Sequence, residues 1–192
     1  MGRELTAAGL VYYGGGNASM WTPDAIHITR EGALLSRLTE ADITTITRMT
    51  EPPTATPAFD APIHRAVYVA TGARAVLHAH PPHVVALSFG RQEYTPHDLE
   101  GRRVLGTVQV VSPRRSVIDV IAAALEKNRI VMVAGHGTYA WGADLWECLH
   151  LTSALEWSAR IALLMAAAGM HTPPPIPANP ASDGGSAPAG PS

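Results

Sequence analysis

The sequence predicts an α/β fold, because short apolar runs alternate along the chain with longer stretches of helical periodicity. Of its 192 residues, 46% are hydrophobic and 16% are charged, so the chain is able to bury a core and is not compositionally disordered. This length predicts one domain. We expect a folded unit over residues 1–171 and a disordered tail over 172–192, which is rich in Pro and Gly and poor in large apolar side chains.

Glycine, proline and capping residues mark the first elements. A short helix is expected over about 2–10, a glycine-rich loop GGGNAS after it, and a strand at about 25–29. Thr39 is a candidate N-cap for a short helix or turn. A proline-rich loop then precedes Asp60, which with the following Ala-Pro begins a helix that ends at Gly72. The loop prolines are Pro52, Pro53 and Pro57.

The remaining elements alternate between apolar runs of strand length and segments with an apolar helical face. Prolines open one of these helices, and the last helix is long and amphipathic. The predicted strands are 73–80, 104–111 and 129–135, and the predicted helices are 81–89, 116–128 and 143–169. These local patterns do not determine the order of the strands in the sheet.

Charge, cysteine and lysine usage exclude several function classes. The formal net charge of −2 disfavours nucleic acid and anionic membranes as partners, because such binding needs clustered positive charge. The single cysteine, Cys148, forms neither an internal disulfide nor a cysteine-based zinc site, which fits the reducing cytoplasm. The sequence shows no apolar run of signal-peptide or membrane-span length. The one lysine, Lys127, falls at the end of a predicted helix, so Schiff-base catalysis, which needs a desolvated lysine, is not expected.

Histidines give the sharpest local signal. His78 and His80 lie two residues apart at the end of a predicted strand, so their side chains point to one face and could share a cation. His136, between glycines after another apolar strand, is the third candidate ligand, and three imidazoles with an open position are typical of a catalytic divalent site. On spacing alone, ordinary strand-end and turn histidines are the alternative. His83 is a weaker competing ligand, and for His64 a packed or supporting role is favoured over direct ligation.

A second signal is the glycine-rich segment 14–19. Its consecutive glycines expose backbone N–H groups that can form an anion nest, and Asn17 and Ser19 add side-chain donors. The segment has no P-loop lysine and no GxGxxG pattern, so a flexible turn is an equal alternative.

Five stretches in a fixed order cover nearly all of residues 5–165: GGGNAS, AIHITREG, DAPIH, VLHAHPPHVVALS and AGHGTYAWGADLWECLHLTSALEWSARIA. In their order and spacing they resemble the class II aldolase and adducin head-domain family. The resemblance implies a central, mostly antiparallel sheet flanked by helices, and a homotetramer with active sites between subunits. It also implies a divalent ion, usually Zn²⁺ with Mn²⁺ or Co²⁺ as alternatives, held by His78, His80 and His136.

The same resemblance assigns roles to other residues. The family's acidic residue stands four positions before the helical histidine, which here is Asp60 before His64, and it accepts and returns a substrate proton. A helix N-cap is the compatible structural alternative for this aspartate. The positions that match substrate-binding residues of the family are Gly16, Asn17, Ser19 and Gly32.

Two departures from the family pattern disfavour a phosphorylated substrate. Glu31 replaces the hydroxyl residue before the glycine of the second loop, and Ala58 and Phe59 replace a Ser-Ser pair before the acid. A carboxylate near a phosphate dianion is repulsive, and the lost hydroxyls leave its oxygens without donors. For a proton-donating tyrosine, Tyr94 and Tyr139 are candidates by residue type alone.

We therefore predict a zinc-dependent aldolase, a lyase that cleaves a small hydroxy-carbonyl or sugar-phosphate substrate through an enediolate held by the ion, like the family's fuculose-phosphate aldolases. A sugar-phosphate 4-epimerase, a decarboxylase or a dehydratase with the same site is the alternative. A non-catalytic, adducin-like interaction module is a third hypothesis, which the retention of all three histidines disfavours. The expected partner is a small-molecule substrate, and the expected location is the cytoplasm.

Overall fold

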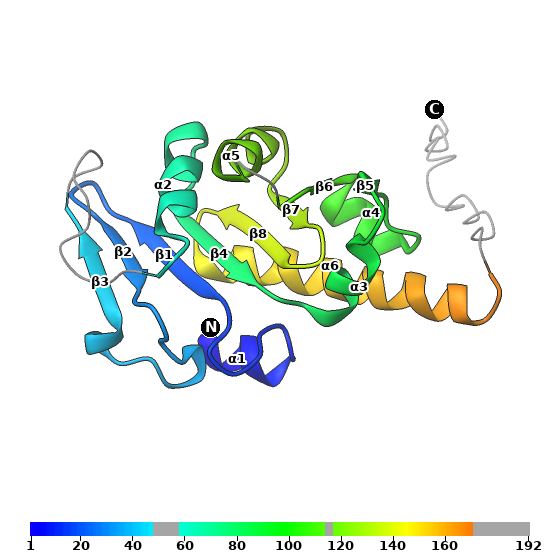
Figure 1. Cartoon of the computed structure of the whole chain (residues 1–192), viewed down its shortest axis with the longest axis horizontal. Helices are drawn as coiled ribbons and strands as arrows, with labels where there is room; N and C mark the ends of the chain where they lie inside the picture. The colour runs from blue at the N-terminus through cyan, green and yellow to red at the C-terminus, as the bar shows by residue number, and fades with distance from the viewer. Residues whose placement is uncertain (48–57, 114–116, 171–192) are drawn as a thin grey trace, which may run out of the picture.

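The computed structural model describes residues 1–47, 58–113 and 117–170, and eight strands within these ranges form one sheet (Figure 1). The strands are β1 (Asn17–Trp21), β2 (Ile26–Thr29), β3 (Ile43–Ile46), β4 (Ala75–Ala79), β5 (Glu93–Tyr94), β6 (Val108–Val111), β7 (Ile130–Val133) and β8 (Gly137–Gly142). Their order in the sheet is β3-β2-β1-β4-β8-β7-β6-β5. Among the described strands only β6 and β7 pair in parallel, so the sheet is mostly antiparallel, as the resemblance implied.

Helices cover both faces of this sheet (Figure 1). The α-helices are α1 (Gly2–Ala7), α2 (Ala61–Ala70), α3 (Pro82–Ser88), α4 (Leu99–Leu105), α5 (Val117–Lys127) and α6 (Leu145–Ala167), and the 3₁₀ helices are η1 (Leu35–Arg37) and η2 (Glu40–Asp42). Helices α2 and α5 pack together on one face, and α6 lies on the other face with α1, α3 and α4 on the same side. The predicted α/β fold is therefore confirmed as three layers, helix on sheet on helix.

The central strand β4 is buried along its whole length and serves two apolar cores. Leu77 and Ala79 face the core beneath α6, whereas Val76 faces the core beneath α2 and α5. A strand buried on both faces has a mostly apolar sequence, and the apolar residues 75–77 made the strand within 73–80 predictable. Because side chains alternate across a strand, His78 points to the same side as Val76, toward α2.

The prediction of a strand over 104–111 is wrong at its beginning. Residues Leu99–Leu105 form helix α4, which Asp98 caps by accepting a hydrogen bond from the Gly101 N–H. The helix ends at Gly106, whose φ of 61° suits glycine. Strand β6 begins only at Val108.

Several strands escaped the sequence patterns because their burial does not follow apolar alternation. β1 lies partly within the segment expected to be a loop, and two of its buried residues are polar, Asn17 and Ser19. In β3 the first two residues reverse the usual pattern, because Ile43 is exposed and Thr44 is buried, and only Ile46 is a buried apolar residue. β5 and β8 were also not predicted. The N-terminal helix, α1, is shorter than expected.

The other predicted elements are present with ends shifted by a few residues. Thr39 caps η2 in a reciprocal capping box with Asp42, as its residue type indicated. The predicted proline loop and the tail at 172–192 fall outside the described residues. Within the described ranges, no helix combines the length and the apolar character needed to cross a bilayer.

Candidate active site

Three histidine side chains converge at one end of the central strands. His78 lies on β4, His80 follows the strand directly, and His136 lies in the turn between β7 and β8. One nitrogen from each ring lies within 4.8 Å of the other two. The ring centroid of His78 lies 4.4 Å from that of His80 and 4.8 Å from that of His136. The three imidazoles therefore lie close together, as the sequence predicted.

The glycines beside His136 are required by the backbone. A Cβ atom at Gly137 would overlap the carbonyl oxygen of Ala79, because β8 pairs closely with β4 there. Gly135 has a φ of 68°, which bends the turn. These two glycines allow the backbone to carry His136 close to the end of β4. They therefore position the histidine, in addition to leaving room for a ligand.

The cluster fits a divalent cation by its protonation and hydrogen bonding. Nδ1 of His78 donates to the carbonyl oxygen of Thr138 over 2.8 Å, so Nε2 of this ring carries the lone pair. Burial lowers the pKa of His78 to about 3 and that of His80 to about 4, which keeps both rings neutral. Neutral imidazoles are the form that binds zinc, and three of them leave a coordination position open for substrate.

Asp60 is the acidic group of the cluster. It occupies the N-cap position of α2 but makes no side-chain capping bond. Instead its Oδ2 accepts a hydrogen bond from Nδ2 of Asn17 over 2.8 Å and lies 3.6 Å from Nε2 of His78. Burial raises the pKa of this carboxyl, but the neighbouring His78 and the hydrogen bond from the Asn17 amide lower it by a larger amount. The pKa therefore lies below its usual value, and the group is ionised at neutral pH. The carboxylate is thus free to act on a substrate.

A buried polar network supports the site from behind. The Ser19 hydroxyl is hydrogen-bonded to Nδ1 of His64 over 2.7 Å and to the Tyr68 hydroxyl over 2.8 Å. His64 is fully buried, and this burial lowers its pKa to about 4. Ser19 is 2% exposed. The structure therefore gives His64 the supporting position that was favoured for it, and it does not bring Ser19 to the cavity where a substrate would lie.

A cavity of about 300 Å³ opens onto the three histidines and Asp60. It contains the predicted substrate-binding positions other than Ser19, together with the three residues that depart from the phosphate pattern. Its lining residues are Tyr12, Gly14, Gly15, Gly16, Asn17, Arg30, Glu31, Gly32, Ala58, Phe59, Asp60, His78, His80 and His136. Oδ1 of Asn17 is buried without a partner among the described residues, so it is available to a substrate hydroxyl.

Two lining residues were not predicted. Tyr12 packs its ring against His80 with a centroid distance of 5.1 Å, and Arg30 forms an ion pair with Asp42 over 2.7 Å. The neighbouring Glu31 accepts a hydrogen bond from the Phe59 N–H over 2.7 Å, so its carboxylate joins two loops at the cavity wall. No sequence pattern marks Tyr12 or Arg30, because both reach the cavity through the path of loops between elements.

Three further candidates from the sequence take different places. Tyr139 is buried beside the site, with its ring stacked on His78 and its hydroxyl near enough to lower the pKa of Asp60. The Tyr94 hydroxyl donates to the carbonyl oxygen of Ser158, outside the cavity. His83 binds Glu156 and does not join the histidine cluster.

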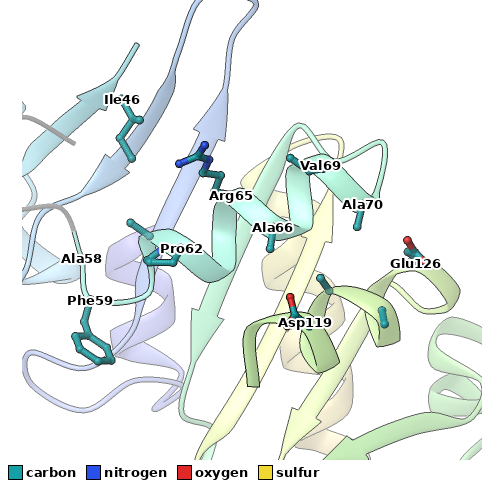
Figure 2. A pocket seen from close by; sticks show the side chains of 13 residues that line it. Ile46, Ala58, Phe59, Pro62, Arg65, Ala66, Val69, Ala70, Asp119 and Glu126 are labelled. Atoms are coloured by element: carbon teal, nitrogen blue, oxygen red, sulfur yellow. The ribbon is translucent and has the colours of Figure 1, made fainter. Parts of the chain in front are cut away.

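A larger hollow, of about 740 Å³, lies between α2 and α5 (Figure 2). Its walls are mostly apolar side chains, with Phe59 at one end and Glu126 at the other. It contains none of the clustered histidines and shares only Ala58 and Phe59 with the smaller cavity. The residues able to do chemistry therefore select the smaller cavity as the candidate active site.

The sequence profile described as Class II Aldolase and Adducin N-terminal domain matches residues 1–163. The chain belongs to this family. The crystal structure of L-fuculose-1-phosphate aldolase from Thermus thermophilus is similar, with a TM-score of 0.84 and 34% sequence identity, over 90% of this chain and 94% of that one. These findings confirm both the family resemblance and the fold class.

Two curated relatives carry another activity in their names. Methylthioribulose-1-phosphate dehydratase of Acidiphilium cryptum (strain JF-5) is 32% identical over 178 residues, which cover 82% of this chain and 83% of that protein. A probable bifunctional methylthioribose-1-phosphate isomerase/methylthioribulose-1-phosphate dehydratase of Nocardia farcinica (strain IFM 10152) is 28% identical over 80% of this chain. The match covers only 32% of the Nocardia protein. The aldolase and dehydratase activities in these names are lyase activities, and the Nocardia name adds an isomerase.

Proposed function

We propose that this chain is a divalent-metal-dependent lyase that cleaves a carbon–carbon bond in a small hydroxy-carbonyl substrate. The observation that carries the proposal is the placement of the Asp60 carboxylate 3.6 Å from Nε2 of His78, free of any capping bond, in a cavity with three converging imidazoles. A carboxylate next to a ligand set with an open position is the arrangement that metal-assisted proton transfer requires.

His78, His80 and His136 are the proposed ligands of Zn²⁺, with Mn²⁺ or Co²⁺ as alternatives. The bound ion supplies Lewis-acid polarisation of the substrate's carbonyl and hydroxyl oxygens. The protein's part is to keep the His78 and His80 rings neutral by burial and to orient His78 through its hydrogen bond to Thr138.

Asp60 is the proposed proton carrier. It accepts the proton of the hydroxyl group β to the carbonyl while the adjacent carbon–carbon bond breaks and an aldehyde leaves. It then returns that proton to the carbon atom that held the broken bond, so the carboxylate is restored. Asn17 holds Asp60 in place through its Nδ2 and offers Oδ1 to a substrate hydroxyl.

A dehydratase is the second candidate, and the named activity of the Acidiphilium relative favours it. In that reaction Asp60 removes the proton α to the carbonyl and passes it to the β-hydroxyl, which leaves as water. Product analysis separates the two reactions, because cleavage yields two carbonyl fragments and dehydration yields one product that is lighter by a water molecule.

For the far end of the substrate we propose contacts with Gly16, Asn17 and Gly32, all in the cavity. We expect an uncharged or carboxylated terminus to be preferred over a phosphate, because Glu31 stands in the same wall. Paired substrates with and without a terminal phosphate test this directly. A strong preference for the phosphorylated member of each pair would overturn it.

We also propose that the chain forms a homotetramer, as the family resemblance implies. We propose that it acts in the cytoplasm, because its single cysteine, Cys148, is buried and forms no internal disulfide. Light scattering on the full chain measures the assembly.

Metal analysis with matched variants tests the function. His80→Ala is expected to abolish turnover and stoichiometric metal together, whereas His27→Ala, which changes a histidine bonded to Thr45 away from the cavity, leaves both unchanged. Retention of stoichiometric zinc in the His80 variant would remove this residue from the ligand set.

A further inference from the structure

The ligand histidines His78 and His80 are held in different ways. His78 is fixed through its own ring, because Nδ1 donates to Thr138 and the ring stacks on Tyr139. His80 has no such hydrogen-bond partner among the described residues, and its Nδ1 is buried without one. It also lies beyond the last residue of β4, so strand pairing does not fix its side chain. Apart from the packing of its ring against Tyr12, the support for the orientation of His80 is its main chain.

Glu156 on α6 binds the chain just after His80. Its Oε1 accepts from Nδ1 of His83 over 2.6 Å, and its Oε2 accepts from the N–H groups of His83 and Val84, each over 3.1 Å. The Glu156 side chain is only 14% exposed. One partly buried carboxylate thus fixes both the His83 side chain and the first turn of α3 against α6, which lies beside it (Figure 1).

The chain between this carboxylate and His80 is short and stiff. It consists of Pro81 and Pro82, whose rings restrict the backbone to φ near −65°. On the other side, the N–H of His80 donates to the carbonyl oxygen of Leu10 over 2.9 Å. His80 is therefore held between two fixed points. Its own N–H is bound by Leu10, and His83, three residues later, is bound by Glu156.

We propose that Glu156 is a positioning residue for the metal centre, which orients His80 through His83 and the Pro-Pro segment. The inference rests on the proposed function, since it requires that His80 be a metal ligand. Outer partners that orient ligands typically contribute 10- to 100-fold in metal affinity. Loss of the Glu156 carboxylate is expected to weaken zinc binding by about 10-fold or more.

Glu156→Gln is the test variant and Glu147→Gln is its matched control. Glu147 lies on the same helix, accepts from the Ala143 N–H over 2.8 Å and pairs with Arg129, and among the described residues neither of these partners contacts His80. Both substitutions remove one partly shielded carboxylate from α6. Zinc dissociation constants are measured by competition with a chromogenic chelator, and the thermal unfolding of each metal-free protein is measured in parallel.

The expected result is a zinc affinity about 10-fold weaker for Glu156→Gln, an intermediate loss for His83→Ala, and less than about a twofold change for Glu147→Gln. Visible absorption of the Co²⁺-loaded proteins should differ from wild type for Glu156→Gln and not for Glu147→Gln, because only the former alters ligand geometry. If Glu156→Gln unfolds, the His83→Ala variant gives the same comparison.

Equal zinc affinity in wild type and Glu156→Gln, or an equal loss in the Glu147 control, would overturn the positioning role while leaving the metal site intact. A wild-type protein that binds no divalent metal would overturn the proposed function and this inference together.

Discussion

The imidazole of His78 lies flat against the phenol ring of Tyr139, with centroids 4.2 Å apart and ring planes 11° from parallel. The two residues are direct cross-strand partners on β4 and β8. Tyr139 is 1% exposed, and its hydroxyl approaches the Asp60 carboxylate. One buried aromatic residue thus supports both a proposed metal ligand and the proposed proton carrier.

Tyr139→Phe is expected to lower kcat about 10-fold without changing zinc content, because the ring that supports His78 remains and only the hydroxyl beside Asp60 is lost. Tyr139→Ala removes the ring as well and is expected to cost about 3–5 kcal/mol in the free energy of unfolding. Steady-state kinetics and urea denaturation measure the two effects. Unchanged kcat in the Phe variant would show that the hydroxyl has no part in the reaction.

Asp60→Asn is expected to reduce kcat by about 10²- to 10⁴-fold while the protein keeps its metal, because the amide preserves size but cannot accept a proton. Metal content and kcat are measured on the same preparation. Asp119→Asn, in the hollow between α2 and α5, is the control and should retain wild-type activity. Loss of metal together with activity in Asp60→Asn would instead identify the carboxylate as a ligand.

Glu31→Gln is expected to raise kcat/KM for a phosphorylated substrate relative to its unphosphorylated counterpart, because it removes a negative charge from the cavity wall and keeps the side chain's reach toward the Phe59 N–H. Glu40→Gln, an exposed change outside the cavity, should leave the ratio unchanged. An unaltered ratio in both variants would mean that the substrate's terminus lies away from Glu31.

The metal-free protein is expected to lose stability as the pH falls from about 6.5 to about 4. Burial lowers the pKa of His64 in the folded state to about 4, whereas the unfolded chain binds a proton near pH 6.5. In this window the unfolded state binds a proton at His64 that the folded state does not bind, which costs up to about 1.4 kcal/mol per pH unit in the free energy of unfolding. His78 and His80, whose pKa values burial also lowers, add to the loss in the metal-free protein.

Urea denaturation in a chelating buffer at about pH 7.5 and about pH 5, on either side of the unfolded-state pKa, measures this dependence. His64→Asn, which keeps a polar atom near the Ser19 hydroxyl but does not titrate, should show a shallower loss of stability. Identical slopes in the variant and the wild type would mean that His64 does not contribute to the pH dependence.

The sequence predicted strands β2, β4 and β7 and every described α-helix except α4, and for β4 and β7 the reason is that continuous burial leaves a clear apolar pattern. It could not reveal β1 or β8 in the same way. Asn17 and Ser19 are buried in β1 because each has a side-chain partner from a distant segment, Asp60 for one and His64 for the other. Pairwise compensation of this kind is invisible to patterns that read one stretch at a time.

The candidate site was predictable to the extent that its chemistry is local. The spacing of His78 and His80 is a property of one strand, whereas their meeting with His136 depends on the pairing of β4 with β8, which only the family resemblance implied. Tyr12 and Arg30 enter the cavity from loops whose paths depend on the whole fold. For Asp60 the sequence allowed both a helix N-cap and a proton-transfer role. Its side chain makes no capping bond, and its carboxylate lines the cavity.

Strand β4, which carries His78, has a strand on each side, β1 and β8, and a helical layer above and below. Backbone amides at such a position exchange with solvent only when the molecule opens globally. The framework that presents the histidines is therefore expected to stand fully formed before any cation arrives. Little of the free energy of ion binding should then be needed to order the chain, so nearly all of it is expected to contribute to affinity.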